Sequence, residues 1–437
     1  MILVHGEIRE DRKQLAVIAA MQADMYRTLA RGDFPRPETV IRACDTLLGR
    51  VLAGEFDSTV NPLLTRFGIS RTYFEQMARL FSRPCLEYKC GIELCDTDGP
   101  VGRPPIGGTT LRRRMPLGIL LHIAAGNVDG LPAYSVVEGL LAGNINILKL
   151  PAGDSGLSVL LLEQLIRVEP SLAEYIYVFD VPSTETETLR TLAGYADGVV
   201  VWGGDAAVRA ARTLAGVDTR IISWGHKLSF AYATPDASDE DLRGLARHIC
   251  ETEQVLCSSC QGIFLDTDDR DRDRDREVQL SFAKRFFGIL REVSDTMGSA
   301  DYGMRAKNAI HIYNERLEAH ETGHTIFSGH GVSVICAEDS QLELSYMFRS
   351  VWVKRLPRSG MVAALRPYKD HLQTVGLLCP DPADRAVLAE LLSRSGLVRI
   401  TTGAGMSRMI CGEAHDGTYP LRLYSRTVET DVVEPSL

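Results

Sequence analysis

Residues 117–150 read LGILLHIAAGNVDGLPAYSVVEGLLAGNINILKL, and this stretch decides the fold. It predicts a strand at 117–123, a helix at 131–142 that ends at Gly143, and a second strand at 145–150. Both strands are apolar on both faces, which is typical of a parallel sheet that helices cover on its two sides.

The same alternation of strands and helices continues as far as residue 223. Further strands are predicted at 175–181, 198–202 and 219–223. Further helices are predicted at 156–168, 184–194 and 205–215, and Ser183 or Thr184 is the expected N-cap of the second of these. Strand–helix–strand units of this length imply parallel strands joined by crossover helices. The chain is therefore expected to be an α/β protein with a doubly wound sheet.

Three turns at the carboxyl ends of the predicted strands are rich in glycine: residues 124–130, 149–156 and 202–205. Ligands of open parallel sheets bind beyond this edge. Glycines allow backbone N–H groups to approach a phosphate, and a helix N-terminus adds a favourable partial charge. The ordinary dinucleotide fingerprint G-x-G-x-x-G is absent from the first of these turns. The turns predict a nucleotide site of a different kind.

A second α/β unit is predicted from about residue 233 to 405, and its most informative stretch is EQVLCSSCQG at 253–262. A cysteine in a polar turn between a helix and a strand can present its sulfur to a cleft, so Cys257 is a candidate nucleophile. Cys257 and Cys260 also form a C-x-x-C, which fits half of a metal site, a redox pair, or one nucleophile beside a bystander. No second C-x-x-C occurs in the chain, which disfavours a metal.

The two ends of the chain have a different character. Residues 1–85 show helical spacing of apolar residues. Residues 86–95 alternate like a strand, and 86–115 are expected to form a two-stranded arm or long hairpin of the sort that makes subunit contacts. The tail at 420–428 also alternates like a strand and is expected to pair with this arm.

Composition excludes several classes of protein. The chain has 437 residues and a formal net charge of -9 with no basic block, so nucleic acid is not an expected partner. No apolar run reaches the roughly 18–20 residues that span a bilayer. The N-terminus lacks the order of a signal peptide, so we expect a cytoplasmic protein whose ten cysteines are reduced thiols.

Four short segments in a fixed order resemble a known family. They are residues 124–130, 140–149, 199–204 and 253–261, followed by His415-Asp416-Gly417. Together they resemble the aldehyde dehydrogenase superfamily, and more closely its LuxC-like acyl-CoA reductases, over about residues 86–430. The resemblance implies an aldehyde dehydrogenase-like fold of two doubly wound α/β domains with a β-hairpin oligomerisation arm. Its expected parts are a helical N-terminal part of the cofactor domain (1–85), the arm (86–115), a Rossmann-like NAD(P)-binding domain (116–232), a catalytic domain (233–405) and a tail returning to the arm (406–437).

The resemblance also implies roles for individual residues. Cys257 matches the family nucleophile, and Asn127 matches the amide that helps to form the oxyanion hole. Lys149 matches the lysine at the adenosine ribose. The remaining residues expected around the cofactor are Gly126, Ala152, Trp202, Gly203 and Gly204.

Two departures from the family pattern are informative. Ser223 stands where hydrolytic aldehyde dehydrogenases carry a glutamate base, and serine is a poor base at neutral pH. This favours transfer of an acyl group to or from a thiol over hydrolysis. Ala152 stands where NAD-preferring members often carry a glutamate for the ribose 2′-hydroxyl. Without that carboxylate Lys149 can pair with a 2′-phosphate, so NADPH is the expected cofactor, with NADH as the other choice.

These observations lead to an expected function. The chain is expected to reduce an acyl thioester, carried by CoA or an acyl carrier protein, to an aldehyde through an acyl-enzyme on Cys257. The alternatives are an acylating aldehyde dehydrogenase working in the oxidative direction and a non-catalytic relative that binds a nucleotide. An acyl-activating partner enzyme and a homodimer or homotetramer are the expected associations, and no metal is expected.

Overall fold

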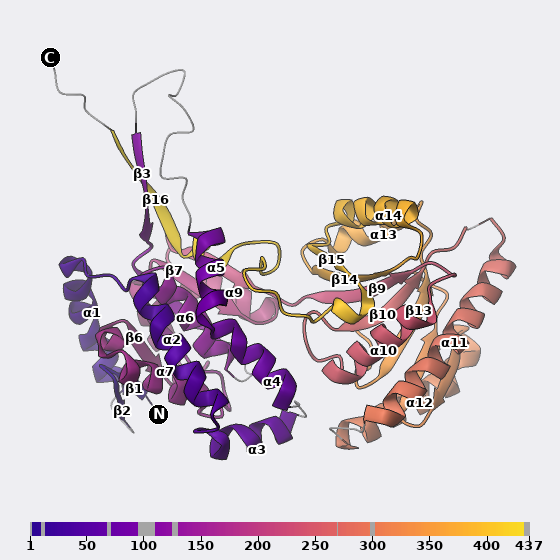
Figure 1. The fold of residues 1–437 in the computed structure, drawn as a ribbon, viewed down its shortest axis with the longest axis horizontal. Coiled ribbons are helices and arrows are strands. Elements are labelled where there is room, and N and C mark those ends of the chain that lie inside the picture. The colour runs from indigo at the N-terminus through magenta and orange to yellow at the C-terminus, as the bar shows by residue number, and fades with distance from the viewer. Residues whose placement is uncertain are drawn as a thin grey trace. The chain divides into compact units, whose positions relative to one another are not determined.

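The computed structural model describes residues 2–9, 14–67, 71–94, 110–124, 130–268, 270–297 and 302–431. The chain divides into two compact units, which Figure 1 shows in sequence colours. Unit 1 comprises residues 1–64, 70–225 and 409–437, and unit 2 comprises 65–69 and 226–408. The chain thus leaves unit 1, builds unit 2 and returns to unit 1 for its last segment.

The core of unit 1 is a sheet with the strand order β2-β1-β6-β5-β4-β7-β8 among the residues described. Its strands are β1 (Ile2–Val4), β2 (Glu7–Arg9), β4 (Ile119–Ile123), β5 (Ile145–Lys149), β6 (Ile176–Phe179), β7 (Gly198–Trp202) and β8 (Arg220–Trp224). All neighbours from β6 to β8 are parallel. The strands β4 to β7 are buried on both faces almost throughout, as a sheet between two layers of helices requires. The predicted parallel sheet is confirmed.

The chain order reverses at β4, which lies between β5 and β7. Such a switch point is where ligands bind in open parallel sheets, outside the carboxyl ends of the strands.

The helices of unit 1 are α1 (Gln14–Arg31), α2 (Pro37–Leu52), α3 (Asp57–Phe67), α4 (Arg71–Ala78), α5 (Arg83–Glu93), α6 (Leu131–Leu141), α7 (Leu157–Val168), α8 (Thr186–Tyr195), α9 (Asp205–Leu214) and α15 (Pro420–Leu423). Short 3-10 helices cover η1 (Arg79–Phe81) and η2 (Pro170–Glu174).

Unit 2 has a second sheet, whose described strands follow the order β11-β12-β13-β10-β9-β14-β15. They are β9 (Leu228–Ala233), β10 (Cys260–Leu265), β11 (Thr325–Gly329), β12 (Val332–Cys336), β13 (Ser350–Arg355), β14 (Leu372–Leu378) and β15 (Arg399–Thr401). Only β11 is antiparallel to its neighbour in this part of the sheet. The helices are α10 (Asp239–Thr252), α11 (Arg272–Met297), α12 (Tyr302–Thr322), α13 (Met361–Leu365) and α14 (Pro382–Ser395), with η3 (Arg366–Tyr368) and η4 (Gly403–Gly405).

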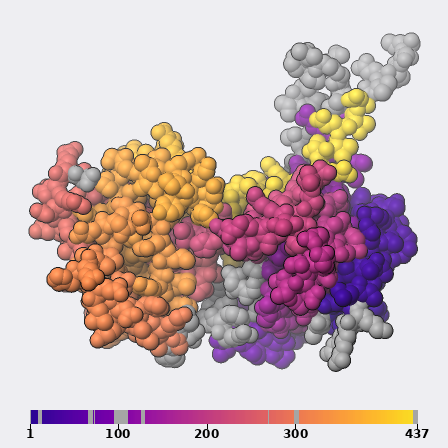
Figure 2. Space-filling model, turned by 180° about the vertical axis from the view of Figure 1, so that it is seen from behind, coloured from indigo at the N-terminus to yellow at the C-terminus, as the bar shows by residue number. Residues whose placement is uncertain are grey.

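A two-stranded ribbon projects from unit 1. It pairs β3 (Thr110–Pro116) with β16 (Ser425–Asp431) in antiparallel register, and both ribbon and space-filling views show it standing away from the body of that unit (Figures 1 and 2). The expected pairing of the tail with the arm is therefore confirmed. Its role in subunit contacts stays a prediction, and residues 95–109 of the predicted arm lie outside the described residues.

Several local predictions are wrong. Residues 86–95 were expected to form a strand, but α5 covers Arg83–Glu93, with Pro84 in the first turn, where its missing N–H costs nothing. The first residues of the chain form strands β1 and β2 instead of a helix, because Ile2–Val4 adds an antiparallel strand beside β6. The tail starts with the short helix α15 before β16 begins.

The predicted N-cap of α8 is also wrong. Glu185 occupies that position and makes no side-chain cap. Ser183 instead accepts a hydrogen bond from Lys149 Nζ at 3.2 Å. The Ser183 hydroxyl therefore binds a side chain at the carboxyl edge of the sheet and does not cap the helix.

The expectation of ten reduced cysteines is wrong at one pair. Cys85 on α5 and Cys411 form a disulfide with a Cα–Cα distance of 5.0 Å. The two residues are 326 positions apart, so no local pattern indicates the contact. Within the described ranges, every helix is too short or too polar to cross a membrane.

Candidate active site

The turn that carries Cys257 begins where α10 ends. Glu253 and Gln254 both adopt left-handed backbone conformations, with φ of 45° and 63°. This conformation is unfavourable for residues with a β-carbon and persists only where the surroundings hold it. The buried side chain of Gln254 supplies part of that support, because its Nε2 donates to Cys260 O and Ser350 O, each at 2.9 Å.

A second left-handed segment braces the first. Met347, Phe348 and Arg349 have φ of 56°, 46° and 70°. Phe348 N donates to Glu253 O at 3.1 Å, and the buried guanidinium of Arg349 pairs with Glu253 Oε1 at 2.7 Å. Removal of either member of a buried ion pair leaves an uncompensated charge. The two segments therefore hold one another in place.

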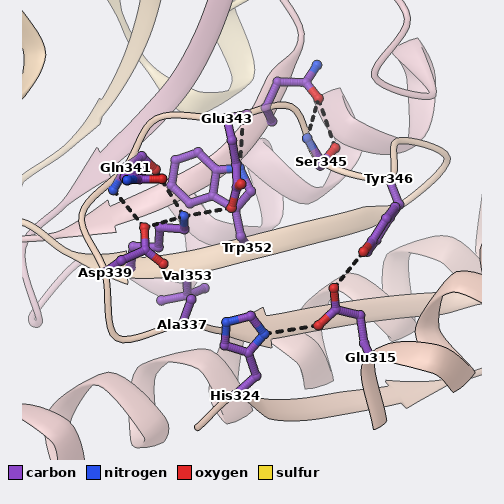
Figure 3. A network of polar contacts seen from close by, with 12 residues as sticks. Glu315, His324, Ala337, Asp339, Gln341, Glu343, Ser345, Tyr346, Trp352 and Val353 are labelled. Atoms are coloured by element: carbon purple, nitrogen blue, oxygen red, sulfur yellow. Dashed lines mark hydrogen bonds and ion pairs between the residues drawn. The ribbon is translucent and has the colours of Figure 1, made fainter. Parts of the chain in front are cut away.

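The chain just before this second segment is fixed by a polar network, shown in Figure 3. The buried Lys354 Nζ lies 2.6 Å from both Asp339 Oδ1 and Glu343 Oε1. At the other end Tyr346 Oη donates to Glu315 Oε1 at 2.5 Å, and Glu315 Oε2 lies 3.0 Å from His324 Nδ1. Hydrogen bonds from Tyr346 and His324 hold the pKa of Glu315 below its usual value against the opposing effect of burial, which is the largest single influence. These contacts tie the chain that leads into the second segment to β13, to α12 and, through Glu315, to His324 just before β11.

Cys257 itself lies just before β10, at the amino edge of the sheet in unit 2, and is exposed. Its carbonyl oxygen accepts a hydrogen bond from Ser229 Oγ at 2.7 Å, and Ser229 Oγ accepts one from Thr374 N at 3.1 Å. Its Sγ accepts a hydrogen bond from Gln373 Nε2 at 3.4 Å. The thiol is thus accessible, while the main chain and sulfur are both held by neighbouring strands.

Cys260 has the opposite surroundings. It is fully buried, burial raises the pKa of its thiol to about 12, and its Sγ donates to Gly262 O at 3.2 Å. The described residues contain no group of three His, Cys, Asp or Glu side chains placed to hold a metal ion. The C-x-x-C therefore consists of one exposed and one inert thiol.

In unit 1, Lys149 ends β5 and faces the carboxyl edge of the sheet. Burial lowers the pKa of Lys149, and the negative charge of Asp180 opposes this shift. Asp180 directly follows β6, where Phe179 is the register partner of Lys149. A hydroxyl (Ser183), an ammonium and a carboxylate thus gather at one end of neighbouring strands.

The turn after β7 has room for a backbone-bound phosphate. Gly203 has φ of 150°, and a β-carbon there would meet Ala207 Cβ at 3.1 Å. Gly204 is the N-cap of α9, and a β-carbon added to it would meet nothing within 4 Å. A helix N-terminus behind two glycines is the kind of place where a phosphate can bind, and the predicted role of these glycines at the cofactor pyrophosphate stays a prediction.

Other predicted site residues are placed differently. The indole of Trp202 is buried and donates from Nε1 to Ser135 Oγ at 3.0 Å, so a cofactor contact would use its backbone. His415 packs edge-on against Trp202 and Trp224, with ring centroids 5.1 and 4.7 Å apart. Ala152 is exposed in the turn after β5. Gly126 and Asn127 lie outside the described residues, and their roles stay predictions.

Two residues of the site were missed by sequence reasoning. Gln373 follows Cys257 by 116 positions, and Asp180 lies in a loop with no motif of its own. His122 on β4, by contrast, is a buried core histidine. Its ring nitrogens lie 2.7 Å from Ser135 Oγ and 3.0 Å from Asn146 Oδ1, and burial lowers its pKa to about 4.

Comparison with known families identifies the chain. The family model described as "Acyl-CoA reductase (LuxC)" matches residues 62–427. The chain belongs to the LuxC family. The resemblance deduced from the sequence motifs is therefore confirmed.

Curated LuxC relatives are similar over parts of their length. The long-chain acyl-protein thioester reductase of Aliivibrio fischeri is 25% identical over 326 residues, which is 72% of this chain and 64% of that protein. The enzyme of the same description from Vibrio harveyi is 31% identical over 160 residues, 36% of this chain and 34% of that protein. This chain therefore spans at most about two thirds of the relatives it matches.

Solved structures show that this LuxC family member has the aldehyde dehydrogenase fold. A putative aldehyde dehydrogenase from Burkholderia cenocepacia superposes with a TM-score of 0.72 at 14% identity, covering 100% of this chain and 99% of the other. Betaine aldehyde dehydrogenase from Staphylococcus aureus, in complex with NAD+, gives a TM-score of 0.70 at 15% identity, covering 96% and 88%. These neighbours confirm the predicted aldehyde dehydrogenase-like α/β fold, whereas the oligomerisation role of the arm stays a prediction.

Proposed function

We propose that this protein reduces a long-chain acyl thioester to an aldehyde with NADPH, through an acyl-enzyme on Cys257. The observation that carries the proposal is the exposed Cys257 thiol, held in a braced turn and hydrogen-bonded to the Gln373 amide, in a member of the LuxC family. Thiolate is the reacting form of cysteine, and a hydrogen-bond donor at sulfur favours it.

The proposed reaction begins with attack of the Cys257 thiolate on the thioester carbonyl. The carrier leaves as its thiolate and takes up a proton from solvent, so that the acyl group becomes bound to Cys257. The Asn127 side chain is the proposed donor to the oxyanion, and one such donor contributes on the order of 3–4 kcal/mol. Reduced nicotinamide, when bound, supplies the hydride that converts this thioester into a hemithioacetal. Collapse of the hemithioacetal releases the aldehyde and restores the thiolate.

Reduction is favoured over hydrolysis by the residue at position 223. Ser223 is exposed near the end of β8, and a serine hydroxyl cannot activate water well at neutral pH. The acyl-enzyme is therefore expected to persist long enough for hydride transfer. The curated relatives are described as acyl-protein thioester reductases, which supports a protein-bound as well as a CoA-bound acyl donor, and an acyl-activating partner enzyme that supplies it.

The proposal is tested by incubating the full chain with long-chain acyl-CoA and NADPH and by following loss of the reduced nicotinamide absorbance. One aldehyde should form for each NADPH consumed, and mass spectrometry of a sample without NADPH should find an acyl adduct on Cys257. Turnover only from aldehyde, NADP+ and CoA would favour the acylating dehydrogenase. Nucleotide binding without any adduct or turnover, with acyl-CoA and acyl carrier protein alike, would contradict the proposal.

We also propose NADPH as the preferred cofactor and NADH as an accepted one. Lys149, with Ser183, offers a positive charge to a 2′-phosphate, whereas Asp180 offers a carboxylate that opposes it. Lys149→Met removes the charge, and we expect it to weaken the binding of NADPH at least about tenfold more than the binding of NADH. The reason is that charged hydrogen bonds contribute about 1.5–3 kcal/mol. Asp180→Asn should shift the preference the other way, towards NADPH.

This prediction is measured as the ratio of KM values for the two cofactors in each variant. Glu87→Gln, on the exposed side of α5, serves as a control for the loss of a carboxylate away from the predicted cofactor turns. Equal weakening of both cofactors in Lys149→Met would show that the lysine binds only the part they share. We further propose that the protein acts in the cytoplasm. We also propose that it forms a homodimer or homotetramer through the β3–β16 ribbon.

A further inference from the structure

Strand β14 holds Cys257 at two points. The first point is its main chain, through Thr374 N, Ser229 Oγ and Cys257 O, with donor–acceptor distances of 3.1 and 2.7 Å. The second is its sulfur, through Gln373 Nε2 at 3.4 Å. Gln373 and Thr374 are adjacent in the strand, so one short backbone segment sets both the position of the turn and the direction of the side chain.

The Gln373 side chain is well placed for this contact. It is 8% exposed, so solvent competes little for its amide. Its main chain is tied to the neighbouring strand, because Val398 N donates to Gln373 O at 3.1 Å. A side chain held in this way donates a hydrogen bond in a fixed direction. The side chain loses little conformational entropy when the contact forms.

We propose that Gln373 is a positioning residue for the nucleophile: its amide N–H donates to Cys257 Sγ, orients the sulfur and favours the thiolate. The amide does not titrate, so this donor is present at every pH at which the protein is folded. A hydrogen bond to a charged acceptor is stronger than one to a neutral acceptor, and this difference stabilises the thiolate over the thiol. The inference rests on the proposed function, because it concerns the same thiol.

The two cysteines of the C-x-x-C show what the donor changes. Cys260 is enclosed by the core and its Sγ faces a carbonyl oxygen, which keeps it a thiol. Cys257 is exposed and its Sγ faces an N–H donor. The reactive cysteine is therefore selected by its partner on β14 as well as by its exposure.

The test measures the thiol directly, without substrate or cofactor. The rate of Cys257 alkylation by iodoacetamide is recorded from pH 6 to pH 10 in the full chain, with the modified residue located by mass spectrometry. In Gln373→Met, which keeps the length but removes the donor, we expect alkylation at pH 7 to slow by about tenfold, as for one lost charged hydrogen bond. The rates should converge at high pH, where the thiolate is fully formed in both proteins. Gln373→Glu should slow alkylation further near neutral pH, since a carboxylate opposes the thiolate.

Gln279→Met is the matched control. Gln279 is also a buried amide of unit 2, and its Nε2 donates to Ala337 O and Val353 O, each at 2.8 Å, with no part in the thiol site. This variant should lose stability but keep the alkylation profile. If Gln373→Met does not fold, Gln373→Asn keeps a polar amide at the strand and withdraws it from the sulfur, so it should give the same shift in profile.

An unchanged profile in a folded Gln373 variant would overturn the inference, and so would a slowing that is equal at all pH values, because that indicates altered access. These outcomes are independent of catalysis. If the acyl adduct never forms but the profile shifts, the proposed function fails while the positioning role stands. If the adduct forms normally and the profile does not shift, the proposed function stands while the positioning role of Gln373 fails.

Discussion

Replacing Cys257 by alanine is expected to lower aldehyde formation from acyl-CoA by at least about 10⁴-fold, the scale seen when an enzyme loses its nucleophile. The turn at 253–259 offers no second exposed thiol, so no other group can carry the acyl thioester there. The acyl adduct should disappear from the mass spectrum. Binding of NADPH should persist, because Lys149 and the glycines after β7 belong to unit 1.

Cys260→Ala provides the matched control, since it removes a thiol three residues away. We expect it to cost stability, because Cys260 is fully buried, and to retain the adduct on Cys257. A wild-type rate of acyl-CoA reduction in Cys257→Ala would rule out the acyl-enzyme. Loss of the adduct in Cys260→Ala, with the adduct kept in Cys257→Ala, would show that Cys260 and not Cys257 is the nucleophile.

Replacing Lys89 by methionine is expected to have the largest effect on stability. Its ammonium lies 2.6 Å from Glu93 Oε1 and 3.0 Å from Glu138 Oε1, and all three side chains are buried between α5 and α6. The substitution leaves two buried carboxylates without their cation, which costs about 3–5 kcal/mol at pH 7. The loss in free energy of unfolding is measured by urea unfolding, monitored through hydrogen exchange in peptides from α5 and α6.

The pH dependence of that loss has a definite sign. Burial raises the pKa of Glu93 above its ordinary value even with Lys89 nearby, and removal of Lys89 raises it further. A carboxyl group with a raised folded-state pKa contributes stability that is complete below the unfolded pKa of about 4.3 and is lost as pH rises through the folded value. The penalty in Lys89→Met should therefore be small near pH 4 and grow towards pH 7.

Two further variants make the stability result specific. Adding Glu93→Gln and Glu138→Gln to Lys89→Met should recover most of the loss, because no charge is then left buried. Arg83→Met breaks an exposed pair with Glu87 on the same helix and should cost less than about 1 kcal/mol. A loss of equal size in Arg83→Met would point to a general weakness of α5 and not to the buried charges.

The sequence was most informative where local pattern and packing agree. The strands from Ile119 to Trp202 were predicted because each is a short apolar run between turn residues, and both its faces are buried. Residues 86–95 were predicted wrongly because Leu86 and Cys90 suit a strand by alternation and a helix by their spacing of four. The ion pairs of Lys89 with Glu93, four residues later, and with Glu138 on α6 decide for the helix.

For the candidate site, the sequence indicated which residues have chemistry but not which of them meet. Cys257, Lys149 and the glycines after β7 lie in recognisable turns. Their partners lie on another strand (Gln373 on β14) or in the loop after β6 (Asp180 and Ser183), and no single-sequence pattern connects residues 116 positions apart. The left-handed segment at 347–349 was missed for the same reason, since its support comes from Glu253 and Gln254.

The division of unit 1 into separate stretches of chain has a consequence for how the protein is made. Residues 409–431 leave the ribosome only after all of unit 2, yet Leu421 N donates to the buried Glu93 Oε2 at 2.7 Å and Tyr424 O accepts from Asn144 Nδ2 at 3.0 Å. Until that segment arrives, both groups lack these partners and β3 has no strand to pair with. The first part of unit 1 therefore stays incompletely hydrogen-bonded until residues 409–431 have been synthesised. A product that stalls before them would expose this unpaired edge to proteases and chaperones.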